Sequence, residues 1–191
     1  NAIFLGPWCF ANNHKYKFWD QKKFIVVPSP WKKPQDILEA SLYIDSLIDK
    51  IIPALSSLMN SFHGVNYSER FWKIYTIDWL LHWLGHLYDR YQRLKHVEQV
   101  VNEKLTVKIL NSKIAYAIDF WDYMKKMEGH YFNLLLMSDI IKNGQFDFLV
   151  TEQINIPYPY NEVEQNKLRD YPKIKSGKTI VEFLKLKLAK F

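Results

Sequence analysis

The sequence predicts an α/β fold that is rich in helix and contains a small, mostly parallel sheet. Short apolar segments that end near glycine or proline alternate with longer segments in which apolar residues recur every three or four positions. Strands that alternate with helices favour parallel pairing. The chain has 191 residues, of which 48% are hydrophobic and 16% aromatic. This length and composition predict one folded core and argue against disorder.

Four segments have the composition of short strands. Ala2–Leu5 is apolar, Phe24–Val27 is apolar and β-branched, and a proline follows each within two residues. Proline lacks the amide donor that a central strand needs, so it ends a strand. Residues 105–110 have an alternating pattern and are rich in β-branched residues, which favour strands. Residues 146–154 form the fourth candidate strand.

Two long segments have apolar residues at the spacing of a helix. Residues 34–63 are expected to form a helix that Pro53 kinks and Gly64 ends, because glycine adopts the left-handed conformation of a helix C-terminus. Residues 119–144 are expected to form another helix, interrupted at Gly129.

A further long helix is predicted from Ser68 to His96, since a serine side chain can accept hydrogen bonds from the first-turn amides. On a wheel of about 100° per residue, most of its circumference is apolar. We expect Trp79, Trp83 and Leu84 to be nearly inaccessible. One narrow strip carries the polar side chains Asp78, His82, His86, Asp89, Arg93 and His96.

Three interpretations of this polar strip stay open. It can be a solvated helix edge, a metal site, or the border of a substrate cleft in which imidazoles bind hydroxyls and exchange protons. An ordinary solvent face more often carries lysine and glutamate. Neither residue type occurs between Asp78 and Arg93, which favours a cleft.

The metal interpretation depends on the four-residue spacing of Asp78, His82 and His86, which zinc sites also use. The two histidines lack the glutamate of a metalloprotease helix, because Trp83 follows His82. A metal would need another ligand from His63, His130 or Asp119. We therefore expect no metal.

Arg90 falls on the apolar side of the same wheel. A guanidinium in such a place needs a partner, because an unpaired buried charge is strongly destabilising. The alternatives are an ion pair near Asp89 or with Glu69, and an anion-binding role at the floor of a cleft. The ion pair is the favoured interpretation.

The formal net charge of +6 does not indicate nucleic-acid binding, because the lysines are scattered and matched by acidic neighbours. The most basic segment is "KIKSGKTIVEFLKLKLAKF", in which a last helix is expected from Ser176. It fits either an ordinary surface helix, which is favoured, or peripheral contact with an anionic membrane or a partner groove.

The single cysteine, Cys9, excludes an internal disulfide framework and fits a reducing compartment. The sequence has neither a signal-peptide pattern at its start nor a run of about 18 uncharged apolar residues. We expect a cytoplasmic protein, with the inner face of the inner membrane as a further location.

Three sequence motifs follow one another along the chain: "FLGPWC", "LMNSFHG" and "YSERFWKIYTIDWLLHWLGHLYDRYQRL". Together they resemble the N-terminal part of a family of bacterial transferases from surface-polysaccharide and O-antigen gene clusters. The matching residues are Leu5, Gly6, Trp8, Cys9, Asn60, His63, Ser68, Arg70, Trp72, Ile74, Trp79, Leu80, Tyr88, Asp89 and Arg90. The sequence departs from the family pattern at Ile77-Asp78, where a Gly-Pro pair is usual.

The resemblance implies a nucleotide-sugar-dependent glycosyltransferase of lipopolysaccharide biosynthesis with two Rossmann-like domains, of the GT-B type. Residues 1–191 would be the N-terminal, acceptor-side domain of a longer protein, whose absent C-terminal domain binds the donor. The acceptor would be a saccharide or lipid-linked saccharide, and no covalent cofactor is expected. The candidate catalytic residues are His82, His86 and Asp89. The candidate substrate-binding residues are Trp8, His63, Arg70, Asp78 and Arg90.

A non-catalytic helical interaction domain is the alternative from another functional class. Its polar strip and basic end would then bind a protein partner or the membrane face.

Overall fold

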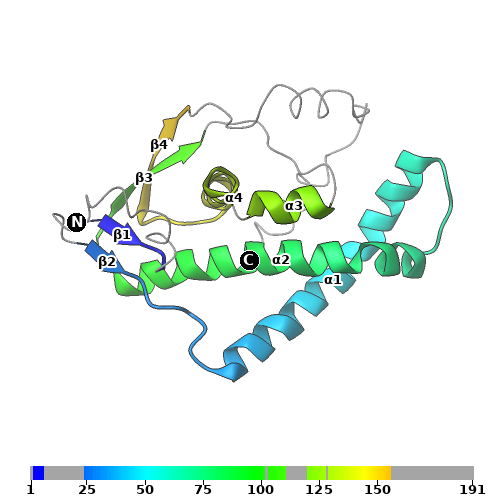
Figure 1. The fold of residues 1–191 in the computed structure, drawn as a ribbon, viewed down its shortest axis with the longest axis horizontal. Helices are drawn as coiled ribbons and strands as arrows, with labels where there is room; N and C mark the ends of the chain where they lie inside the picture. The colour runs from blue at the N-terminus through cyan, green and yellow to red at the C-terminus, as the bar shows by residue number, and fades with distance from the viewer. Residues whose placement is uncertain (1, 7–23, 102, 111–119, 128, 156–191) are drawn as a thin grey trace.

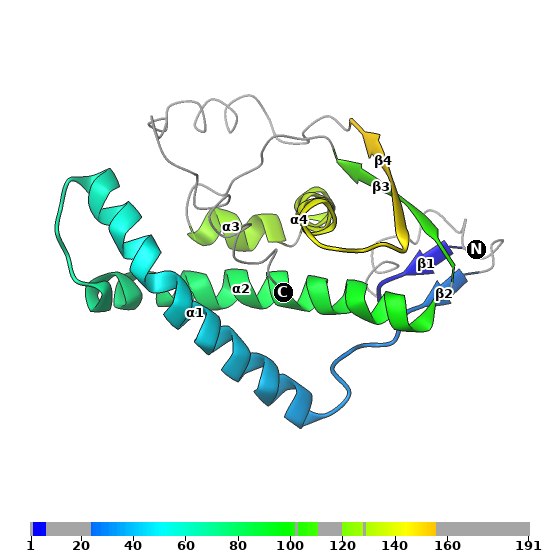
Figure 2. The ribbon, with the colours of Figure 1, turned by 180° about the vertical axis from the view of Figure 1, so that it is seen from behind.

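The computed structural model describes residues 2–6, 24–101, 103–110, 120–127 and 129–155. Two long helices dominate the fold, two shorter helices lie beside the second of them, and two strand pairs lie near its C-terminal end (Figures 1 and 2). The elements in chain order are β1 (Ala2–Phe4), β2 (Phe24–Val26), α1 (Pro34–His63), α2 (Glu69–Val100), β3 (Leu105–Leu110), α3 (Phe120–Met127), α4 (His130–Asn143) and β4 (Leu149–Ile154).

Helix α1 has the expected bounds, and it ends at the glycine that was predicted to end it. The Asp36 carboxylate accepts hydrogen bonds from the backbone amides of Lys32 and Lys33, both at 2.9 Å, which satisfies donors at the helix start. Gly64 ends the helix with φ 65°, a left-handed conformation that glycine adopts without steric cost. Pro53 lies inside the helix, and the kink expected there stays a prediction.

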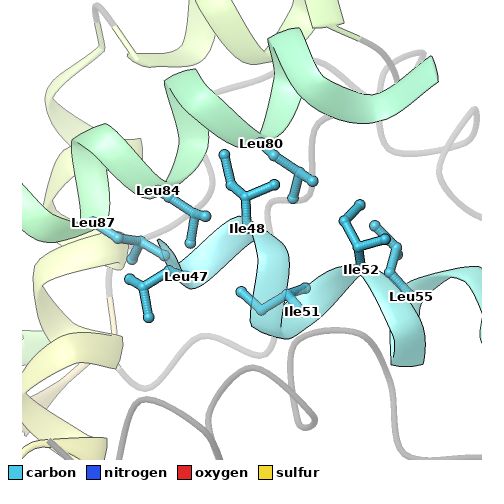
Figure 3. Packing of buried hydrophobic residues seen from close by; sticks show 8 residues of the cluster. All are labelled: Leu47, Ile48, Ile51, Ile52, Leu55, Leu80, Leu84 and Leu87. Carbon is cyan, nitrogen blue, oxygen red and sulfur yellow. The ribbon is translucent and has the colours of Figure 1, made fainter. Parts of the chain in front are cut away.

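Helix α2 begins where it was predicted, because the Ser68 hydroxyl accepts a hydrogen bond from the Phe71 amide at 3.2 Å. It packs against α1 through a cluster of aliphatic side chains (Figure 3). The cluster consists of Leu47, Ile48, Ile51, Ile52, Leu55, Leu80, Leu84 and Leu87. Burial of this aliphatic surface is the main attraction between the two helices.

The predicted burial of the apolar arc of α2 is confirmed for Leu84, which is 1% exposed. It is wrong for Trp79 and Trp83, which are only partly buried and stack on each other with ring centroids 5.3 Å apart. The arc is wider than the surface that α1 covers. Near the start of α2, Ile74 and Tyr75 are accordingly exposed.

The described strands form two separate parallel pairs. In the first pair Ala2 lies opposite Phe24, and in the second Leu105 lies opposite Leu149. Parallel pairing is therefore confirmed, but among the residues that the structure describes the strands do not join into one sheet. The likeness to a Rossmann-like half of a glycosyltransferase stays a prediction.

Helices α3 and α4 are separated at Gly129, the interruption expected from the sequence. Helix α4 then contacts the end of β3, where the Ser138 hydroxyl accepts a hydrogen bond from the Leu110 amide at 3.0 Å. The packing of Leu110 against Leu135 joins the same two elements. The expected helix from Ser176 lies outside the described residues.

None of the described helices combines the length and apolarity that crossing a membrane requires.

Candidate functional site

The polar strip of α2 divides into an exposed part and a covered part. Asp78 and His82 are exposed to solvent, whereas His86 and Asp89 are partly buried and Arg93 is 8% exposed. The covered part faces side chains from three other regions of the chain, so its chemistry differs from that of the exposed part.

Asp89 is the centre of a hydrogen-bond network. Its carboxylate accepts hydrogen bonds from Nε1 of Trp31 at 2.6 Å and from Nε of Arg93 at 2.9 and 3.0 Å. It also pairs with Nη1 of Arg90. Burial alone would raise the pKa of Asp89, but the hydrogen bonds from Arg93 and Trp31 and the two arginine charges lower it below its usual value. The carboxylate is therefore ionised at neutral pH.

Trp31 reaches Asp89 from the segment before α1, and aromatic rings hold it there. The ring of Tyr88 lies 6.0 Å from the Trp31 ring and 4.9 Å from the Tyr43 ring. Burial raises the pKa of Tyr43 to about 12, so its phenol stays protonated. Trp31 is consequently fixed both by ring packing and by the Asp89 carboxylate.

Arg90 connects α2 to the break between α3 and α4. Its Nη2 donates a hydrogen bond to Oδ1 of Asn133 at 2.9 Å. The Asn133 amide in turn donates to the backbone carbonyls of Met127 at 2.6 Å and Gly129 at 3.0 Å. The structure thus shows the ion pair with Asp89 that was favoured from the sequence.

Arg93 completes the network at β1. In addition to its bonds with Asp89, its Nη1 donates to the backbone carbonyl of Leu5 at 3.5 Å. The network therefore joins α2 to the end of β1, to the segment before α1 and to the α3–α4 break. Because each oxygen of Asp89 already accepts hydrogen bonds, this geometry favours an organising role for Asp89 over proton transfer. Its predicted catalytic role stays a prediction.

His86 makes a hydrogen bond of a different kind, to a buried phenol. Its Nδ1 lies 2.8 Å from the hydroxyl oxygen of Tyr123, a residue of α3 that is only 2% exposed. Burial lowers the pKa of His86, the Arg90 and His82 charges add to this effect, and Asp89 opposes it. Burial also raises the pKa of Tyr123. At neutral pH the pair is therefore a neutral imidazole and a protonated phenol.

His82 lies one turn before His86 and is exposed. Its ring centroid is 5.5 Å from that of Phe120, the first residue of α3. Such an arrangement, an accessible imidazole beside an aromatic ring, can exchange a proton with a bound hydroxyl. His82, His86 and Asp89 thus lie along one edge of α2, as their spacing predicted.

The other candidate residues lie elsewhere. His63 and Arg70 are exposed at the turn between α1 and α2, where the His63 ring stacks on Trp72 at 5.7 Å. Trp72 and His86 are fourteen residues apart on α2, or about 21 Å at 1.5 Å per residue. The described residues therefore do not gather His63 and His86 into one small site. Trp8 lies outside the described residues.

In the part of the chain that the structure describes, no three His, Cys, Asp or Glu side chains are grouped so that they could hold a metal ion.

Sequence reasoning missed three participants in these contacts: Trp31, Tyr123 and Asn133. Each comes from a different element and meets α2 only through tertiary packing. No spacing rule connects Tyr123 to His86, which are 37 positions apart. An available signal was the four-residue spacing of Tyr123 and Met127, which is typical of the buried face of a helix.

No curated protein and no solved structure matches the chain. A protein-family model does match it, over residues 1–190, and its description is LIC12162 family transferase. The match covers nearly the whole chain, including every candidate residue named above. The chain therefore belongs to the LIC12162 family of transferases.

Proposed function

We propose that this transferase is a glycosyltransferase of bacterial surface-polysaccharide biosynthesis. It takes a sugar from a nucleotide-sugar donor and gives it to a saccharide or lipid-linked saccharide acceptor. Residues 1–191 form the acceptor side, and the donor nucleotide is bound mainly by a further domain of the same enzyme. The acceptor-side assignment suits contact with the inner face of the membrane.

The observation that carries the proposal is the pair of histidines on one edge of α2. His82 is exposed beside Phe120, and His86 is held by Tyr123 one turn away. Acceptor hydroxyls need a hydrogen-bonding and proton-accepting group, and aromatic rings pack well against the apolar faces of sugars. Membership of a transferase family and the resemblance of the sequence motifs to surface-polysaccharide transferases support the same class.

The proposed reaction is a substitution at the anomeric carbon of the donor sugar. The acceptor oxygen forms a bond to this carbon while the bond from the carbon to the nucleotide phosphate oxygen breaks. The leaving nucleotide keeps the electron pair of the broken bond, and the acceptor hydroxyl passes its proton to a base on the enzyme. We assign this base to His82, because its imidazole is accessible.

The network around Asp89 has a supporting role in this proposal. Its ionised carboxylate fixes Arg90, and Arg90 fixes the α3–α4 break through Asn133. This break directly precedes α4, while α3 carries both Tyr123 and Phe120. The network thereby keeps α3 in place against the histidine edge of α2.

The proposal is tested by supplying the enzyme with a panel of nucleotide sugars, together with saccharide and lipid-linked acceptors. We expect release of free nucleotide and a product whose mass exceeds that of the acceptor by one sugar residue. Transfer of an acyl, methyl or phosphoryl group from another donor, with no nucleotide sugar consumed, would contradict the proposal. A second sample without acceptor separates transfer from simple hydrolysis of the donor.

A further inference from the structure

The contact between His86 and Tyr123 determines which atom of the imidazole can act on a ligand. A neutral imidazole carries one proton, on either Nδ1 or Nε2, and the hydrogen bond made by one nitrogen selects the tautomer. Here Nδ1 is occupied by the Tyr123 hydroxyl. Among the described residues Nε2 makes no hydrogen bond, and it is not one of their fully buried unpaired atoms. Nε2 is therefore the ring nitrogen left for a ligand.

The direction of this hydrogen bond follows from the burial of Tyr123. If Nδ1 donated to the phenol oxygen, the phenol proton would need another acceptor. In the described segments the Tyr123 hydroxyl has no partner other than His86, and the side chain is 2% exposed. A buried donor without an acceptor is destabilising, because its lost hydrogen bond to water is not replaced. The cost is avoided when the phenol donates its proton to Nδ1.

We propose that Tyr123 is a positioning residue that donates a hydrogen bond to Nδ1 of His86 and thereby keeps the imidazole proton on Nε2. His86 then presents a hydrogen-bond donor to an oxygen atom of the substrate and does not act as a base. This inference rests on the proposed function for the identity of the substrate, but the tautomer itself does not depend on it.

The two histidines therefore have different roles. His86, held from α3, donates through Nε2 to a sugar hydroxyl or to a phosphate oxygen, whereas His82 accepts the proton of the acceptor hydroxyl. The charged and titratable groups around His86 are Arg90, His82 and Asp89 on α2 and Tyr123 on α3. Burial lowers the pKa of His86, and the Arg90 charge lowers it further, so the ring stays in the neutral form that has distinct tautomers.

The tautomer is measured directly by nitrogen NMR of the protein labelled at histidine, at a pH above 7. The His86 signals are assigned by their loss in His86→Gln. We expect Nε2 to have the chemical shift of a protonated ring nitrogen and Nδ1 that of an unprotonated one. A protonated Nδ1 in the wild-type protein would overturn the inference, whether or not the enzyme transfers sugars.

Tyr123→Phe keeps the ring that packs edge-on against Phe132 but removes the hydroxyl. We expect the two His86 nitrogen shifts to move toward each other, because both tautomers become populated. The matched control is Tyr75→Phe, which removes an exposed hydroxyl from the same helix as His86 and should leave these shifts unchanged. Unchanged His86 shifts in a folded Tyr123→Phe protein would contradict the positioning role.

The transfer rates of two His86 variants show whether His86 acts as a hydrogen-bond donor through Nε2 or as a base. This test does not require Tyr123→Phe to fold. The amide nitrogen of glutamine can take the place of Nε2 as a donor but cannot accept a proton. We expect His86→Ala to lower kcat by about 10²-fold, the scale of one lost transition-state donor. His86→Gln should recover most of this loss. Equal losses in both variants would overturn the donor role.

Discussion

At the scale of single residues, the site depends on charges that are partly removed from water and fully paired. The Asp89 side chain is 21% exposed, and its negative charge is paired with two arginines, of which Arg93 is the more buried. Replacing one member of such an ion-pair group lowers the stability of the fold more than replacing the whole group by apolar residues. The remaining charges then stay desolvated without their partner.

Asp89→Asn should therefore destabilise the protein by about 3 kcal/mol, the lower part of the range for breaking a buried ion pair. The asparagine keeps the size of the side chain but removes the negative charge that Asp89 supplies to Arg90 and Arg93. Urea unfolding followed by circular dichroism measures the change. Asp49→Asn is the matched control, because it breaks the exposed pair with Lys73 and should cost less than about 1 kcal/mol. Equal losses would contradict the paired-charge account.

The lowered pKa of His86 predicts a dependence of stability on pH. Its pKa in the folded protein lies below that of the unfolded chain, so the folded state resists protonation. The stabilisation is present above the unfolded value of about 6.5 and is lost as pH falls toward the folded value. The free energy of unfolding should thus decrease more between pH 7.5 and 5.5 in the wild type than in His86→Gln. Parallel curves for the two proteins would argue against the burial of this imidazole.

At the scale of elements, the fold depends on the contact of α1 with α2. Leu84 is 1% exposed at its centre, whereas Leu81 is 40% exposed on the same helix. We expect Leu84→Ala to cost about 2–5 kcal/mol, from lost burial and a residual cavity. Leu81→Ala should cost less than about 1 kcal/mol. A cost below about 0.5 kcal/mol at Leu84 would contradict the observed packing.

Two glycines should respond to alanine in opposite directions. Gly64 has φ 65°, so alanine there adopts a strained conformation and should destabilise the protein by about 1 kcal/mol. Gly85 lies inside α2, and a methyl group there would meet no atom within 4 Å. Alanine at this position should stabilise the protein by about 0.5–1 kcal/mol, because glycine is a poor helix former. Thermal unfolding of both variants checks the signs, and a stabilising Gly64→Ala would show that the helix ends differently.

At the scale of the whole molecule, the sequence predicted what local signals determine. Ser68, Gly64 and Gly129 mark helix ends through their own backbone and side-chain chemistry, and the structure confirms each. The separation of the strands into two pairs was not predicted, because pairing depends on contacts that span the chain. Leu105 meets Leu149, for example, 44 positions later in the sequence.

The candidate site shows the same division between local and distant information. Helical spacing placed His82, His86 and Asp89 on one edge of α2, and the structure agrees. Periodicity could not show that His86 meets Tyr123 or that Asp89 meets Trp31, since these partners come from other elements. The family resemblance assigned His63 to the same cleft, but its ring stacks on Trp72, which lies about 21 Å along α2 from His86.

The measurement that tests the central claim most directly is the sugar-transfer rate of His82→Ala. His82 is exposed, so its removal should leave the unfolding temperature unchanged. Any loss of activity is then due to the missing imidazole and not to a less stable fold. The account predicts that kcat falls by about 10²-fold or more, as for a lost acid–base group. Lys95→Ala, at an exposed ion pair on the same helix, should keep the wild-type rate. Full activity in His82→Ala would contradict the account and make this edge of α2 a solvated helix face.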